Sequence, residues 1–178
     1  MTVFAMVARF RSPADRRHGH ALLAGLHTVD EARAALQTMQ ANVAKAGGQI
    51  SVGLTVFPPY ADGLFKNGCC SHSFSYQNAG DWPWFGARIV QGLAQPELGL
   101  VDEAKAALRP MIDTVCQYQD FNECAPLLWV ALWRCFPIVA ARRRWYNQHN
   151  IPSGSAKFHG AAGAIGKALR MLYGNFSL

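Results

Sequence analysis

The chain has 178 residues, of which 51% are hydrophobic and 16% are charged. This length favours one domain, and the apolar content excludes an intrinsically disordered chain, which carries few hydrophobic residues and many charges. The net charge of +6 is raised locally by the arginine run 142–144, which a solvated surface explains, so no nucleic-acid partner is expected.

The N-terminal third is predicted to hold one well-marked helix. Residues 1–19 are basic and irregular, and the single domain is expected to span 20–178. Thr28 and Glu31 have the spacing of a capping box, and apolar residues follow at helical intervals until Gly47 ends the helix. The segment 50–57 is rich in β-branched residues and predicts a short strand. A long loop of prolines, glycines and aromatics follows at 58–80, and such loops are usually functional.

Three further helices are predicted in the rest of the chain. One begins at Pro83, with Asp81 as a candidate N-cap. The second covers 102–118 and contains Pro110, which predicts a kink or a break. The last covers 158–173. The fold class is therefore mainly α, with long irregular loops and little or no sheet.

Residues 124–143 form an atypical apolar segment. Within it, 126–141 resembles a membrane helix followed by arginines, but it is short and contains Arg134 and Pro137. A span needs about 20 predominantly apolar residues. A buried helix or an insert is therefore the preferred interpretation, and a membrane partner is not expected.

The five cysteines do not form a recognisable framework. They are an odd number without regular spacing, which is not typical of a disulfide scaffold, and no C-x-x-C pair predicts a structural metal. Free thiols indicate a reducing compartment, so a cytoplasmic location is expected. The histidines also lack metal-ligand spacing, and no nucleotide or dinucleotide motif appears. No metal and no cofactor are expected.

One stretch of sequence carries a family resemblance. Residues 76–86 read Y-Q-N-A-G-D-W-P-W-F-G, residues 55–60 read T-V-F-P-P-Y, and residues 151–163 read I-P-S-G-S-A-K-F-H-G-A-A-G. Together they resemble the six-hairpin glycosidase superfamily, whose members fold as (α/α)6 toroids. The resemblance implies that the 76–84 loop lies at the mouth of a sugar-binding cavity. The helices predicted here amount to about half of such a toroid, its C-terminal part.

Glycoside hydrolysis usually needs two carboxyl groups placed across the scissile bond. Asp81, which follows a glycine turn in the aromatic loop, is the first candidate acid, although a helix N-cap also explains an aspartate there. Glu123 is the candidate second acid. Where the resemblance leads us to look for an acid beside an aromatic pair, the sequence has Arg144. This departure puts hydrolysis by this chain in question.

The candidate substrate-binding residues are aromatic or hydrogen-bonding side chains. Aromatic rings stack on sugar faces, amides bond hydroxyl groups, and an arginine about two turns after Asp81 is placed to pair with another acid. Core packing is the alternative for the rings, turn stabilisation for the amides, and a plain surface or structural position for the arginine and the histidine. The candidates are Tyr60, Tyr76, Gln77, Asn78, Trp82, Trp84, Arg88 and His159.

The expected function is therefore that of a glycoside hydrolase-like domain fragment whose carbohydrate partner is held at 76–84. The alternative is a non-catalytic helical interaction protein. Half a toroid exposes helix faces that attract a partner. That partner is a second copy, giving a homo-oligomer, or a missing N-terminal half.

Overall fold

A computed structural model describes residues 16–47, 51–64, 72–74, 76–119, 121 and 157–174. Its regular elements are all helices, and the bounds are Arg16–Leu23 (α2), Val29–Lys45 (α3), Pro83–Leu93 (α4), Val101–Tyr118 (α5) and His159–Tyr173 (α6). The prediction of a mainly helical chain is confirmed for this part of the protein. The first four residues of α2 lie inside the segment 1–19, which the sequence analysis treats as irregular.

Helix α3 begins and ends where its local signals place it. The Thr28 hydroxyl accepts a hydrogen bond from the backbone N–H of Glu31, and the Glu31 carboxylate accepts one from the N–H of Thr28. At the other end Gly47 adopts a φ of 77°, a conformation that costs a residue with a Cβ atom. Both ends of the predicted helix are therefore confirmed.

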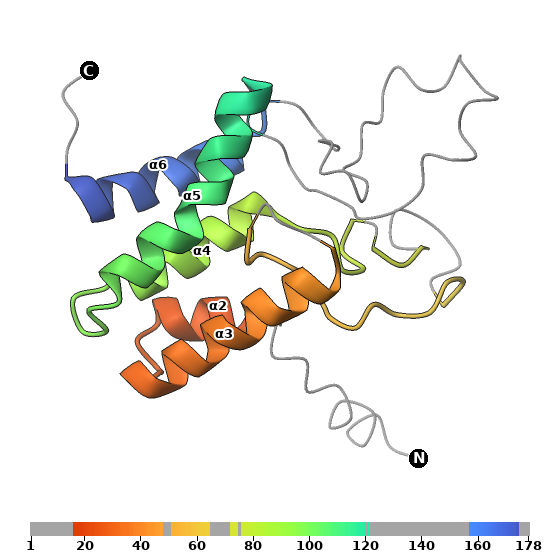
Figure 1. Cartoon of the computed structure of the whole chain (residues 1–178), viewed down its shortest axis with the longest axis horizontal. Coiled ribbons are helices and arrows are strands. Elements are labelled where there is room, and N and C mark those ends of the chain that lie inside the picture. Colours follow the sequence, from red (N-terminus) through yellow and green to blue (C-terminus); the bar gives the residue numbers. More distant parts are fainter. Residues whose placement is uncertain are drawn as a thin grey trace.

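Helix α4 is the centre of the fold. It is buried on nearly all sides, as expected for a helix that is apolar around its circumference, and it packs against α2, α5 and α6 (Figure 1). Pro83 occupies the first turn, where its missing N–H costs nothing. The N-cap, however, is Trp82 and not Asp81, so the N-cap interpretation of Asp81 is wrong.

Helix α5 lies across α4, and α6 runs beside α4 (Figure 1). Helix α5 is continuous through Pro110, and the predicted break does not occur. The carbonyl of Ala106 loses its helical partner there, but Ala106 is exposed, so water is available to it. The start of α6 is joined to the end of α5 by a bond from the N–H of Phe158 to the carbonyl of Phe121, with the two atoms 2.7 Å apart.

The core is one apolar cluster contributed by all five helices. Its largest fully buried members are Leu22, Met39, Leu93, Leu100, Leu108, Met111 and Ile165. A smaller cluster of Val43, Leu54 and Ala79 lies beside it and joins α3 to the loop that precedes α4. The second cluster therefore attaches the irregular part of the chain to the helical part.

The predicted strand at 50–57 does not form. Within 51–57 the structure has only an isolated antiparallel bridge between Leu54 and Asp81. The β-branched residues of this segment instead fill space beside the 76–84 loop, so tertiary packing overrides local β-propensity. No helix among the residues described is both long and apolar enough to cross a membrane. All of the segment 124–143, including 126–141, lies outside those residues.

Candidate functional site

The segment 51–55 and the loop 76–84 run side by side at the N-terminal end of α4. The N–H of Thr55 donates to the carbonyl of Gly80 over 3.2 Å, and the N–H of Trp82 donates to the carbonyl of Gly53 over 3.1 Å. The approach is close, because a Cβ atom on Gly53 would lie 2.2 Å from the Trp82 carbonyl oxygen. Glycine at position 53 is therefore a steric requirement of this pairing.

The Asp81 side chain points into this contact. It is 1% exposed, and its Oδ2 accepts a hydrogen bond of 2.8 Å from the N–H of Ser51. The Ser51 hydroxyl donates to Oδ1 and itself accepts from the N–H of Gly53 at 2.8 Å. Burial raises the pKa of Asp81 to about 6, against the opposing effect of the bonds from Ser51. In this arrangement both carboxylate oxygens hold the 51–53 segment.

Asn78 holds a different part of the chain in the same manner. Its side chain is 1% exposed, its Oδ1 accepts from the N–H of Tyr60 at 2.7 Å, and its Nδ2 donates to the Tyr60 carbonyl at 3.1 Å. The same Nδ2 lies 3.1 Å from the carbonyl oxygen of His72. One buried amide thus joins the loop to two segments earlier in the chain. This matches the turn-stabilising interpretation of Asn78.

Three residues without glycine's freedom adopt left-handed backbone conformations between 74 and 79. The φ angles are 58° for Phe74, 42° for Tyr76 and 68° for Ala79. Such conformations cost free energy for residues with a Cβ atom and persist only where the surroundings enforce them. The bonds made by Asn78 and Asp81 supply that enforcement. Strain concentrated in a short loop is typical of ligand-binding sites.

The aromatic side chains of the loop form a continuous row. Tyr76 and Trp82 meet edge to face with ring centroids 4.9 Å apart, and the Trp82 indole N–H donates to the Tyr76 carbonyl over 3.0 Å. The Phe85 ring centroid lies 5.6 Å from that of Trp82 and 4.5 Å from that of Trp84. Trp82 is 5% exposed, while the other three rings are half-buried. The partly accessible faces therefore belong to Tyr76, Phe85 and Trp84.

The structure brings most of the predicted site residues together, at different depths. Asn78, Asp81 and Trp82 are buried, and Tyr60, Tyr76, Gln77, Trp84 and Arg88 are half-buried. His159 is exposed at the start of α6. Glu123 lies outside the described residues, so its placement relative to Asp81 stays a prediction.

Ser51 is the residue that sequence reasoning missed. It is 5% exposed and supplies both hydrogen bonds that Asp81 accepts, yet it stands 30 positions earlier in the chain. No motif marks it, since a serine before an apolar segment occurs in many contexts. A second aspartate, in the loop 58–80, also bonds a residue from a later part of that loop. Asp62 accepts bonds from the N–H and hydroxyl of Ser73, which hold its pKa below the usual value.

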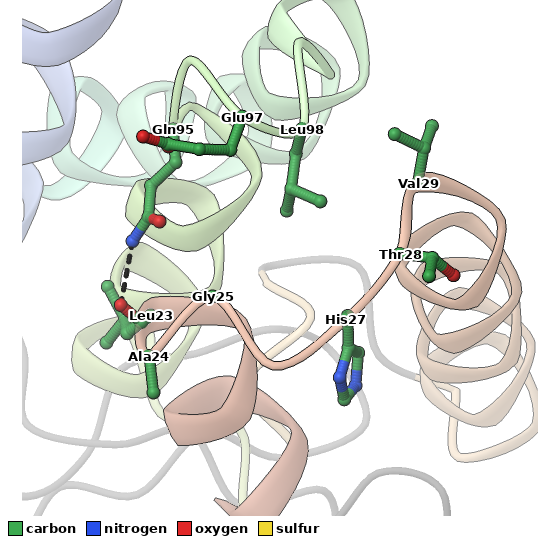
Figure 2. A pocket seen from close by; sticks show the side chains of 9 residues that line it. All are labelled: Leu23, Ala24, Gly25, His27, Thr28, Val29, Gln95, Glu97 and Leu98. Atoms are coloured by element: carbon green, nitrogen blue, oxygen red, sulfur yellow. Dashed lines mark hydrogen bonds between the residues drawn. The ribbon is translucent and has the colours of Figure 1, made fainter.

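A cavity of about 590 Å³ lies at the opposite end of α4 from this loop. Figure 2 shows the turn after α2 on one side of it and the turn after α4 on the other, joined by a bond from Gln95 to the carbonyl of Leu23. Its remaining lining residues are Ala24, Gly25, His27, Thr28, Val29, Glu97 and Leu98. None of the predicted site residues lines it.

Comparisons with protein-family models, curated proteins and solved structures found no match. The six-hairpin resemblance therefore depends on the sequence of residues 55–60, 76–86 and 151–163. The structure adds the helical content and the geometry of the first two of these segments.

Proposed function

We propose that this chain binds carbohydrate at the 76–84 loop, as part of a helical domain related to the α/α toroids. The observation that carries the proposal is the conformation of the loop. Phe74, Tyr76 and Ala79 all have positive φ, and the buried Asn78 and Asp81 side chains hold them there. A chain gains nothing in stability from such strain, so a preformed binding surface is the best account of it.

The half-buried side chains in and beside the 76–84 loop support a sugar as the ligand. Tyr60, Tyr76 and Trp84 offer half-buried rings, and Gln77 offers an amide with donors and an acceptor. A pyranose presents an apolar face of C–H groups and a rim of hydroxyls, which match a ring and an amide respectively. Rigid aromatic side chains also bind with a small loss of conformational entropy.

Binding, not hydrolysis, is the activity proposed for the described residues. Burial raises the pKa of Asp81 to about 6, a value suited to a general acid, but both carboxylate oxygens are buried and bonded to Ser51. A hydrolase also needs a second carboxyl group across the scissile bond. The expected partner, Glu123, lies outside the described residues. Catalysis by the pair Asp81 and Glu123 is therefore an extension of the proposal that requires the Asp81 side chain to become accessible.

A titration with neutral oligosaccharides, followed by tryptophan fluorescence, tests the proposal. Tyr76→Ala and Gln77→Ala are each expected to weaken binding by about tenfold, the cost of roughly 1.4 kcal/mol of lost contact. The matched controls are Tyr173→Ala on α6 and Gln37→Ala on α3, which remove the same residue types from exposed positions. Circular dichroism checks that each variant keeps its helices.

The proposal fails if wild-type protein gives no saturable response across a panel of glucans, mannans and galactans. It also fails if the loop variants and the controls behave alike. In either event light scattering decides the alternative, because an interaction protein that pairs with a second copy would elute as a dimer.

A further inference from the structure

One stripe of α4 faces α6 and carries unusual polar groups. Trp84, Arg88 and Gln91 follow one another at intervals of four and three residues, which places them on one face of the helix. The Nε2 of Gln91 donates to the carbonyl of Ala164 over 2.8 Å, so this face is directed toward α6. Figure 1 shows α4 and α6 running in the same direction, with both N-termini at the end that holds the 76–84 loop.

Two buried polar atoms of this stripe have no hydrogen-bond partner. They are the Nε of Arg88 and the Oε1 of Gln91, and among the described residues no other buried side-chain nitrogen or oxygen is left unpaired. Gln91 is 1% exposed, and its amide orientation is fixed because the Ala164 carbonyl requires a donor. Unpaired buried polar groups cost free energy, and their concentration one helical turn apart calls for a ligand or a bound solvent molecule.

Arg88 lies at the end of the aromatic row. Its guanidinium carbon is 5.9 Å from the centroid of the Trp84 ring, and it makes no ion pair with any residue in the described ranges. The first turn of α6 contains no acidic residue, and no side chain caps its N-terminus. The charged or titratable side chains of α6 are His159, Lys167, Arg170 and Tyr173, so neither helix supplies a carboxylate to neutralise Arg88.

We propose that Arg88 forms a subsite for the carboxylate of an acidic sugar, such as a hexuronate, bound along the row from Tyr76 to Trp84. This rests on the proposed carbohydrate binding and names its substrate class. The planar guanidinium fork matches a carboxylate with two parallel hydrogen bonds. The guanidinium carbon of Arg88, 5.9 Å from the centroid of the Trp84 ring, lies within the range of a cation–π interaction, which positions the charge at the end of the row.

The test compares sugars that differ only at this carboxylate. Wild-type protein is titrated with oligoglucuronates and with neutral glucose oligosaccharides of the same length and linkage. The acidic series is expected to bind about tenfold more tightly at low salt, an advantage that falls as salt screens the charge. Arg88→Met keeps the apolar stem and is expected to abolish this preference, so that the acidic and neutral series bind the variant with the same affinity.

Two further variants separate the subsite from general electrostatics. Arg88→Lys keeps the charge but loses the fork, so a partial preference for the acidic series is expected. Arg170→Met removes one positive charge from an exposed position of α6 and is expected to leave the preference unchanged. Removing an unpaired buried donor does not weaken the fold, so Arg88→Met should melt at or above the wild-type temperature.

The outcomes for the two proposals are distinct. If neutral and acidic sugars bind equally, or if Arg88→Met keeps the preference for acidic sugars, the carboxylate subsite is overturned and carbohydrate binding stands. If neither series binds the wild type, both proposals fail. A preference lost equally in Arg88→Met and Arg170→Met also overturns the subsite, because it would reflect net charge alone.

Discussion

The two ends of α4 are held in different ways. At its N-terminus the chain is held by buried polar side chains and by close backbone approach. Asp81 accepts a hydrogen bond from the N–H of Ser51, and Asn78 accepts one from the N–H of Tyr60. Near its C-terminus one bond, from Gln95 to the Leu23 carbonyl, joins the two turns, which otherwise use local devices: a capping box at Thr28 and glycines with positive φ that meet no neighbour within 4 Å. The first arrangement costs strain and desolvation, and the second does not. Strain and desolvation that the fold retains at the N-terminal end of α4 lower its stability, so we expect the functional site at that end.

Glycine substitutions test this contrast with the largest expected effect. Gly53→Ala would place a Cβ atom 2.2 Å from the Trp82 carbonyl oxygen, and backbone on both sides leaves nothing flexible to yield. We expect a loss of at least about 4 kcal/mol in the free energy of unfolding. At the other end, Gly99→Ala meets only the cost of its φ of 62°, about 1 kcal/mol. Denaturant unfolding of both variants checks the difference, and equal losses would contradict it.

The pH dependence of stability tests the buried Asp81. Its pKa is raised from 3.8 in the unfolded chain to about 6 in the fold, so the folded state disfavours the ionised form. The associated stability is fully present below pH 3.8 and is lost as the pH rises through about 6, a change of about 3 kcal/mol.

Asp81→Asn is expected to remove that change, because a neutral amide still accepts from Ser51. Urea unfolding of both proteins from pH 4 to 8 gives the difference between their free energies of unfolding at each pH. The exposed acids Glu31, Asp62 and Glu103 have lowered pKa values that work in the opposite sense, and they cancel in this difference. A wild-type minus variant difference that stays flat with pH would show that Asp81 is not desolvated.

The smallest effect is expected at the capping box. Thr28→Ala removes the hydroxyl that accepts the N–H of Glu31, one of the orphan donors in the first turn of α3, at a cost of about 1 kcal/mol. Because the cap is exposed and local, carbohydrate affinity at the 76–84 loop should not change. A shift in the thermal midpoint of a few degrees, measured by circular dichroism, is the expected result. A loss of sugar binding in this variant would show that the two ends are coupled.

The same contrast explains what the sequence revealed. Thr28, Glu31 and Gly47 act within one or two helical turns, and their spacing alone predicted α3 correctly. The N-cap prediction for Asp81 was wrong because its carboxylate bonds Ser51 instead of the start of α4. Ser51 is 30 positions away, and no sequence motif marks it. The strand predicted at 50–57 was wrong for a related reason, since those residues pair with the loop at a single bridge.

The sequence predicted where the candidate site lies in the chain, but not which of its side chains are buried. The aromatic and amide composition of 76–84 marked it, and the structure gathers those residues at the start of α4. Which rings would be buried depends on packing against segments far along the chain. Trp82 was one of the candidate sugar-binding rings, with core packing as the alternative, and it is 5% exposed with its indole bonded to the Tyr76 carbonyl. Tyr76 and Trp84 retain more accessible rings.

The Trp82 indole N–H gives the most direct measurement of a preformed loop that binds sugar. In nitrogen-15 NMR spectra, with Trp82→Phe and Trp84→Phe used for assignment, the Trp82 indole signal should be protected from solvent exchange before ligand is added. Saturating oligosaccharide should then shift the Trp84 and Trp82 signals. Rapid exchange of the Trp82 indole in the free protein, or a spectrum unchanged by the sugars, would contradict the account.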